Sequence, residues 1–179
     1  PKVGIPVRYC TVVADPPWPE ETSWNRRKSG RIDWAYDLMS YEQIDALGVC
    51  DLVGESAHLY VWSTYRSLEH AFSTVRAWGF TYKYTLTWCK PIGLGHFYRS
   101  STEFLLFGTR GVNFPLQRRD VGTHFTGRRT DHSTKPQEAY DMIESVSPGP
   151  YLELFARRPR SGWSVWGKEV ACDVEVVGA

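Results

Sequence analysis

Short apolar segments alternate along the chain with segments of helical periodicity, and the two kinds of segment predict strands and helices. Two of the apolar segments carry hydrophobic side chains on both faces, as strands inside a sheet do. Strands are predicted over Tyr9–Ala14, Ala57–Ser63, Tyr82–Cys89, Thr102–Thr109 and Tyr151–Ala156. Helices are predicted from Tyr41 to about Leu47, over Ser67–Trp78 and over Pro136–Val146.

Local signals mark the ends of these helices. Ser40 is followed three residues later by Gln43, which is a capping-box pattern. Gly79 is a natural C-cap, and Pro136 suits the first helical position. Residues 19–34 and 112–134 lack periodicity and are predicted loops. Strands alternating with helices predict an α/β fold with a mostly parallel sheet flanked by helices, in one domain over residues 1–179.

The composition adds three constraints. Hydrophobic residues make up 42% and charged residues 23% of the 179 positions, which is ordinary for a globular protein, but aromatics reach 15% and offer stacking surfaces for bases. The net charge is only +1, yet arginines cluster, and Arg26 and Arg27 are candidate phosphate contacts in a predicted loop. The four cysteines and five histidines show no zinc-ligand spacing, so we expect a reducing, cytoplasmic compartment and no metal. No apolar run is long enough to predict a membrane span.

The strongest chemical signal follows the first predicted strand, where the chain reads Asp15-Pro16-Pro17-Trp18. Proline cannot continue a central strand, so the chain must leave the sheet here with the carboxylate of Asp15 at the strand end. The corner then offers a carboxylate, a proline carbonyl and an aromatic surface. Two acceptors beside a stacking face suit an exocyclic amine on a flat ring.

The first strand is not followed by the GxGxxG pattern of dinucleotide-binding folds, and the chain contains no P-loop. A nicotinamide dehydrogenase is therefore disfavoured, and any nucleotide-like cofactor should lack a pyrophosphate. S-adenosylmethionine (SAM) meets that condition.

The chain resembles the permuted amino-methyltransferases that modify N6 of adenine, the family that contains the catalytic subunit of the eukaryotic messenger-RNA methyltransferase and bacterial and phage relatives. The resemblance runs from about Val12 to Glu169. It rests on these motifs in order: Asp15-Pro16-Pro17-Trp18, Tyr36-x-x-Met39-Ser40, Leu59-x-Val61-Trp62, Trp78-Gly79-Phe80, Trp88-x-Lys90, Gly95-His96, Glu103-x-x-Leu106-x-Gly108, His132-Ser133-x-Lys135-Pro136, Glu153-Leu154-Phe155-Ala156-Arg157 and Gly162-Trp163-x-x-Trp166-Gly167-x-Glu169.

This resemblance implies a Rossmann-like class I methyltransferase sheet with a circularly permuted motif order, SAM as cofactor and a site built from many of these motifs. The implied catalytic residues are Asp15, Pro16, Pro17 and Trp18, with Trp18 as the stacking partner of the base. The implied substrate contacts are Tyr36 and Glu103, beside Arg26 and Arg27 from the charge pattern, and His96 is either a substrate contact or an exposed loop histidine. The implied cofactor contacts are Asp15, Lys135, Glu153, Phe155, Arg157, Lys168 and Glu169. Lys135 either meets the cofactor carboxylate or pairs with Glu103, and Phe155 is either a cofactor contact or core. Many relatives carry Asn where this chain has Lys168.

The expected activity is SAM-dependent methyl transfer to the N6 amine of adenine in nucleic acid. A chain of 179 residues without an additional nucleic-acid-binding domain favours DNA over RNA, in a bacterial or phage-infected cell. A homodimer is compatible with this size. Two alternatives stay open: a non-catalytic nucleic-acid-binding partner of a methyltransferase, and transfer to the N4 amine of cytosine, because the corner chemistry is the same for both bases.

Overall fold

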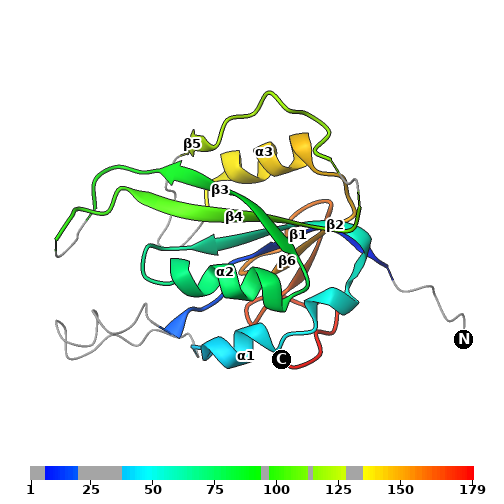
Figure 1. Ribbon diagram of the computed structural model, residues 1–179. Coiled ribbons are helices and arrows are strands. Elements are labelled where there is room, and N and C mark those ends of the chain that lie inside the picture. Colours follow the sequence, from blue (N-terminus) through cyan, green and yellow to red (C-terminus); the bar gives the residue numbers. More distant parts are fainter. Residues whose placement is uncertain (1–6, 20–37, 94–96, 113–114, 128–134) are drawn as a thin grey trace, which may run out of the picture.

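The protein is described here from a computed structural model, which places residues 7–19, 38–93, 97–112, 115–127 and 135–179. Within this part of the chain, seven strands form one sheet in the order β5-β3-β4-β2-β1-β6-β7. The helices lie on both faces, with α3 on one side and α1 and α2 on the other (Figure 1). The elements are β1 (Tyr9–Ala14), α1 (Tyr41–Asp45), the 3₁₀ turn η3 (Val49–Asp51), β2 (Val53–Ser63), α2 (Leu68–Ala77), β3 (Thr81–Cys89), β4 (Thr102–Arg110), β5 (His124–Thr126), α3 (Gln137–Val146), β6 (Tyr151–Leu154) and β7 (Trp163–Trp166).

Only β4 runs against the other strands of this sheet in the described residues. Strand β1 lies at the centre, parallel to β2 on one side and to β6 on the other. The predicted α/β class and the mostly parallel sheet are therefore confirmed.

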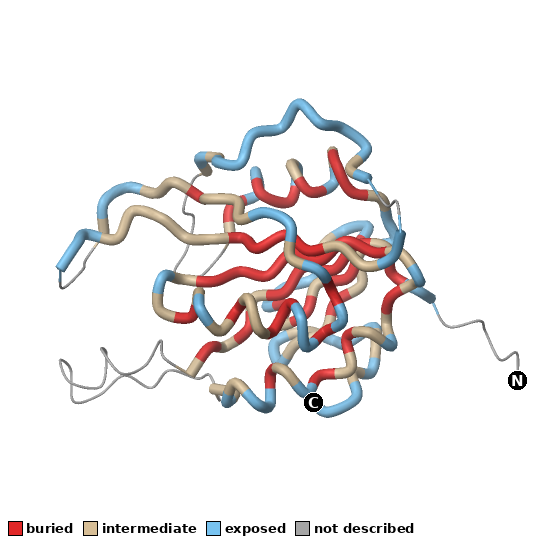
Figure 2. The backbone as a smooth tube through the Cα atoms, viewed as in Figure 1, coloured by how far each residue is buried: buried red, intermediate tan, exposed pale blue. Residues whose placement is uncertain are grey.

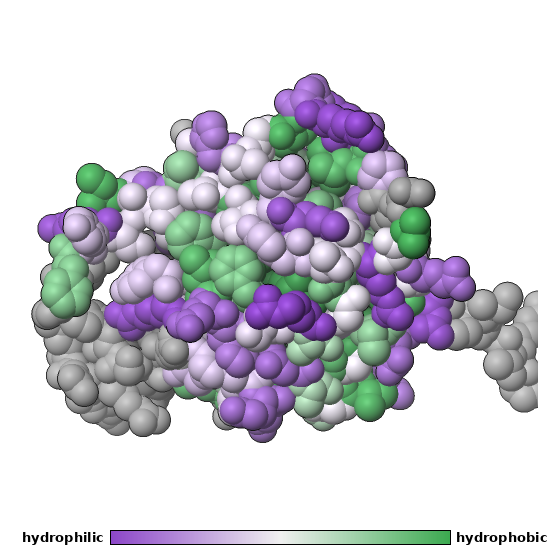
Figure 3. All heavy atoms as spheres, in the orientation of Figure 1, coloured by the Kyte–Doolittle hydropathy of each residue, from purple (hydrophilic) through white to green (hydrophobic). Residues whose placement is uncertain are grey.

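The core lies on both faces of the central strands, which are the most deeply buried segments of the backbone (Figure 2). Val12 and Ala14 of β1 face α1 and α2, whereas Val13 faces α3. A strand covered on both faces must be apolar throughout, which explains the unbroken hydrophobic run. Hydrophilic side chains occupy the band where α2 meets solvent (Figure 3).

Two of the three predicted helix signals form as expected. Ser40 accepts a hydrogen bond from the backbone of Gln43, whose side chain accepts one from the backbone of Ser40, so the capping box at α1 is complete. Gly79 takes φ +81° directly after α2, a conformation that favours glycine. Pro136 is the N-cap of α3 and not its first helical residue.

The strands differ from the predictions in their boundaries and in number. Strand β2 begins at Val53, four residues early, and the predicted loop over residues 112–134 contains the short strand β5. Strand β6 ends at Leu154 because Phe155 turns to φ +62°, which is incompatible with a strand. The strand predicted to be last is followed by β7. No helix within the described residues is long and apolar enough to cross a bilayer.

Candidate active site

Asp15 lies immediately beyond the carboxyl end of β1. The ladder between β1 and β6 runs as far as Ala14 opposite Leu154, and the amide of Asp15 donates a last, long bond of 3.4 Å to the carbonyl of Leu154. After β1 the chain continues through α1 to β2 on one side, and after β6 it continues to β7 on the other. Asp15 is thus at the point where the strand order reverses, which is the position where open α/β sheets bind ligands.

The corner after Asp15 is held by hydrogen bonds to its own backbone. The amide of Trp18 donates to the carbonyl of Pro16 at 2.9 Å, and the amide of Met39 donates to the carbonyl of Pro17 at 3.3 Å. Pro16 is buried, whereas Asp15 and Pro17 are partly exposed. One lone pair of the Pro16 carbonyl is therefore already used, and the second remains for another donor.

Trp18 does not present a stacking face, so the prediction that it stacks on the base was wrong. Its side chain is 1% exposed and packs in the core between β1 and the helices α1 and α2. The indole Nε1 donates to the carbonyl of Trp62 at 3.0 Å, and its ring contacts Tyr41 and His70. The large apolar indole gains more from burial than from exposure at a corner, and it anchors the turn to β2.

Lys135 connects Asp15 to a second carboxylate. Its Nζ lies 3.0 Å from Asp15 Oδ1 and 3.1 Å from Glu103 Oε2, and Lys90 Nζ lies 2.5 Å from Glu103 Oε1. The four side chains form a chain of alternating charge from Lys90 to Asp15. The prediction that Lys135 and Glu103 lie near each other is confirmed, whereas the contact with Asp15 and the role of Lys90 were not predicted.

This arrangement fixes the charge of Glu103 and Lys135. Burial raises the pKa of Glu103, but the ammonium groups of Lys135 and Lys90 outweigh it and hold the pKa below its ordinary value. Burial lowers the pKa of Lys135, but Asp15 and Glu103 outweigh it and raise the pKa well above its ordinary value. Lys135 therefore stays an ammonium, and its Nζ also lies 5.0 Å from the centre of the Trp62 ring.

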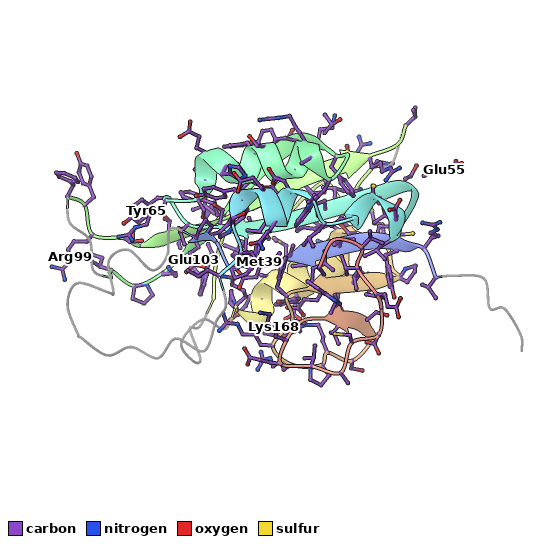
Figure 4. The ribbon with its side chains drawn as sticks, turned by 90° about the horizontal axis from the view of Figure 1, so that it is seen from below. Met39, Glu55, Tyr65, Arg99, Glu103 and Lys168 are labelled. Atoms are coloured by element: carbon purple, nitrogen blue, oxygen red, sulfur yellow. The ribbon has the colours of Figure 1, made fainter. Side chains whose placement is uncertain are left out.

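The sheet brings these charges together from distant parts of the sequence. Trp88 pairs with Glu103 across β3 and β4, so Lys90, two residues further on, lies beside Glu103 where the hairpin leaves the sheet. Lys135 directly precedes Pro136, the N-cap of α3. Figure 4 shows Glu103 and Met39 toward one end of the sheet and Glu55, near the start of β2, at the opposite end.

The carboxyl end of β6 lies next to Asp15 and carries backbone strain. Phe155 is a non-glycine residue with φ +62°, and strain of this kind is concentrated at functional sites. Its half-buried ring meets Trp166 edge to face, with 5.3 Å between ring centres. Gly167 permits the close approach of the two strand ends, since a Cβ there would lie 2.2 Å from the carbonyl oxygen of Ala156.

Glu153 is held on the α3 face of β6. The hydroxyl of Tyr140 donates to its Oε1 at 2.6 Å, and Arg160 Nε lies 3.8 Å from its Oε2. The Arg160 guanidinium lies 3.4 Å from the centre of the Tyr140 ring. Burial raises the pKa of Glu153 above its ordinary value, although the Tyr140 hydrogen bond and Arg160 counteract this. A contact between Glu153 and a cofactor stays a prediction.

The remaining predicted residues divide into two groups. Arg157, Lys168 and Glu169 are exposed, and they follow β6 and β7 at the carboxyl ends of these strands. Arg26, Arg27, Tyr36 and His96 lie outside the described residues.

No group of three or more His, Cys, Asp and Glu residues in the described part of the chain could hold a metal ion. Four tryptophans and one histidine are buried, namely Trp62, Trp78, Trp88, Trp163 and His58, whereas Trp166 is partly exposed.

Comparison with known proteins decides the family. The family model of MT-A70 matches residues 9–169. The chain belongs to the MT-A70 family. This membership confirms the predicted family, and it supports the predicted enzyme class, an adenine-N6 methyltransferase.

Individual relatives are similar over most of this chain. The chain is 27% identical to the type II methyltransferase M.MunI of Mycoplasma sp. over 182 residues, which covers 91% of the chain and 78% of that protein. It is 27% identical to a putative N(6)-adenosine-methyltransferase MT-A70-like protein of Medicago truncatula over 95% of the chain and 28% of that protein. It is 29% identical to the N(6)-adenosine-methyltransferase MT-A70-like protein of Drosophila melanogaster over 84% of the chain and 24% of that protein. The chain thus spans most of M.MunI but less than a third of the two MT-A70-like proteins.

Proposed function

We propose that this protein is a SAM-dependent methyltransferase that transfers a methyl group to the N6 amine of adenine in nucleic acid, with DNA favoured over RNA. The observation that carries the proposal is the carboxylate of Asp15 beyond the central strand, held at 3.0 Å by an ammonium that stays charged. Family membership supplies the reaction class.

Lys135, Phe155 and Glu169, which lie near the carboxyl ends of β1, β6 and β7, fit SAM in three respects. An ammonium has three N–H donors, and the contacts of Lys135 with Asp15 and Glu103 use two, which leaves the third for the cofactor carboxylate. Phe155 offers a half-exposed aromatic ring for an adenine face. Glu169 follows the strand next to β6, where folds of this type place an acid that binds ribose hydroxyls. When bound, SAM would supply a methyl group on an electrophilic sulfonium.

Asp15 and Pro16 would prepare the acceptor. The lone pair of an exocyclic adenine amine is delocalised into the ring and makes the nitrogen a poor nucleophile. Lys135 contacts Asp15 Oδ1, so among the described residues the other carboxylate oxygen would accept one amine hydrogen, and the Pro16 carbonyl would accept the second. Both bonds strengthen as the nitrogen becomes tetrahedral and positive, so they stabilise the transition state more than the ground state. No proton needs to leave before the methyl group is attacked.

Glu103 would act on this site through Lys135. Both of its oxygens already contact a lysine, so its geometry supports a positioning role more directly than the predicted contact with substrate. The double pairing holds Lys135 in one place and keeps its ammonium directed at Asp15.

The preference for DNA rests on the similarity to M.MunI, a type II methyltransferase, over 91% of this chain. In a duplex the target base must be flipped out or already unpaired, because the amine is otherwise paired inside the stack. The intact acidic corner argues against a non-catalytic partner. Cytosine N4 is disfavoured by the adenine-N6 relatives.

Methyl transfer from isotope-labelled SAM to unmodified DNA and RNA tests the proposal, with nucleoside mass spectrometry as the readout. We expect N6-methyladenine, with more in DNA than in RNA. Label in N4-methylcytosine would overturn the assigned base. Absence of label from both polymers, together with absence of SAM binding by calorimetry, would favour the non-catalytic partner.

A further inference from the structure

The hairpin between β3 and β4 exposes aromatic residues at its tip. Phe97 and Tyr98 are each 92% exposed, and Ile92 on the other arm is 74% exposed. Single exposed hydrophobic residues scattered over a surface are ordinary, but Phe97 and Tyr98 are consecutive and form a small exposed aromatic patch. The hairpin extends past the ends of the neighbouring strands in Figure 1, and hydrophobic atoms mark the same margin of the molecule in Figure 3.

The two arms of the hairpin are joined by hydrogen bonds that reach the residues next to Phe97 and Tyr98. The amide of Lys90 donates to the carbonyl of Ser101 and the amide of Gly93 donates to the carbonyl of Ser100, both at 2.7 Å. Arg99 Nε donates to the carbonyl of Gly93 at 3.0 Å. A hydrogen-bonded ladder therefore leads up to the two aromatic residues, whose side chains are exposed and lie outside the core.

The same hairpin begins at the charge cluster of the active site. Lys90 and Glu103 stand at its base, and Tyr98 precedes Glu103 by five residues. Five extended residues span roughly 15 Å, and stacked bases repeat every 3.4 Å or so along a strand. Figure 4 shows Arg99 far out from the sheet and Glu103 close to it. The tip is thus a few nucleotide steps from the proposed position of the target amine.

We propose that Phe97 and Tyr98 stack on unpaired bases of a nucleic acid near the target adenine. The inference rests on the proposed function. Every base has a π-face, so stacking on exposed aromatic rings is tolerant of sequence, and arginine commonly accompanies it. Arg99 is exposed beside the pair. A second exposed aromatic residue with an arginine lies beyond the carboxyl end of β2, where the Arg66 guanidinium is 5.5 Å from the ring centre of Tyr65.

The pair would keep the target adenine accessible. A flipped base leaves a gap in the stack, and its neighbours gain by stacking on another flat surface. Aromatic rings on the hairpin would supply that surface and compensate part of the unstacking cost. Such a contact would matter for polynucleotides and not for free adenosine.

The test uses a single-stranded DNA oligonucleotide that contains 2-aminopurine beside one adenine. Binding is followed by fluorescence anisotropy, and 2-aminopurine emission reports stacking. The double variant Phe97→Leu with Tyr98→Leu keeps the apolar character and removes the π-faces. We expect its Kd to rise at least ten-fold, since stacking on an aromatic residue is worth roughly a five- to 150-fold change per base. The 2-aminopurine quenching should also be lost.

Tyr84→Ala is the matched control, because Tyr84 is 60% exposed on β3 of the same hairpin but lies away from the tip. Its Kd should stay at the wild-type value. Replacing both tip residues by Trp should restore tight binding and quenching. Thermal unfolding of each variant checks that the fold is unchanged.

The outcomes separate the inference from the proposed function. An unchanged Kd and unchanged methylation in the Leu variant would overturn the inference and leave the proposed function standing. Loss of a dimer in sedimentation with unchanged DNA binding would assign the tip to a contact between copies of the chain, and would also overturn it. Aromatic-dependent binding without methyl transfer by the wild-type protein would support the inference and overturn the proposed function.

Discussion

Replacing Lys135 by Met tests the charge cluster that holds Asp15. Lys135 contacts two carboxylates at 3.0 and 3.1 Å, and the three side chains are only 14–24% exposed. With an effective dielectric constant of about 20, each contact is worth roughly 5 kcal/mol before desolvation is subtracted. Removing one partner from a buried ion pair costs about 3–5 kcal/mol. Since Glu103 keeps Lys90, we expect the lower end, about 3 kcal/mol.

For a chain of this size, a loss of about 3 kcal/mol lowers Tm by roughly 6–12 °C. Thermal unfolding by circular dichroism measures it directly. Arg118→Met is the matched control, because the Arg118–Asp120 pair is 2.7 Å apart but its side chains are 54% and 68% exposed. Solvent screens an exposed pair and leaves it little stabilising effect, so the control should shift Tm far less than the Met variant does.

The pH dependence distinguishes charge from packing. The pKa of Glu103 is held below its ordinary value by the lysines that outweigh its burial, so its stabilising contribution is complete above that ordinary value and is lost as the pH falls through the lowered one. Without Lys135 the carboxylate of Glu103 takes up a proton more readily. The deficit of the Met variant should therefore be large near about pH 7 and shrink near about pH 4.5. A deficit of less than about 1 kcal/mol, or one that does not change with pH, would refute the electrostatic account.

Three further changes have defined outcomes. Gly167→Ala should destabilise the fold by about 1–3 kcal/mol and weaken SAM binding, because the added Cβ would collide with the backbone of Ala156. Gly122→Ala is the control, since no atom lies within 4 Å of its added Cβ, and it should change neither the unfolding free energy nor the SAM affinity measured by calorimetry. Trp18→Phe removes a buried hydrogen bond and should cost about 1–3 kcal/mol in denaturant unfolding without raising the Kd for DNA; a raised Kd would restore the stacking role. Replacing Arg26 and Arg27 by Ala should weaken DNA binding in titrations at several salt concentrations and reduce the salt slope by about 2. An unchanged slope would exclude phosphate contacts at these arginines.

The elements with strong local signals could be predicted from the sequence. The double-faced hydrophobic run of Tyr9–Ala14, the Ser40 capping box and the Gly79 C-cap each depend on a few neighbouring residues, and each forms as expected. Strand β7 has only four residues and β5 only three, too few for a periodicity to be recognised. Their presence depends on pairing with β6 and β3, which lies beyond local sequence.

The site was partly predictable for the same reason. The acid at the end of the first strand follows from local rules about proline, and a mostly parallel sheet is expected to place such strand ends at one edge. Lys135 and Asp15 are far apart in sequence, and only the sheet order brings them to 3.0 Å. The side-chain direction of Trp18 is likewise a tertiary property, since an indole beside a corner can face the core or the solvent.

The most direct test of the central claim is the single-turnover rate of methyl transfer by Asp15→Asn, with SAM and an adenine-containing oligonucleotide both saturating. Lys135 would select the amide oxygen, so the amide NH₂ would face the substrate amine and could not accept its hydrogen. The account predicts a rate at least about 100-fold below wild type, with SAM affinity changed little. A rate within about threefold of wild type would contradict the claim that the Asp15 carboxylate activates the N6 amine.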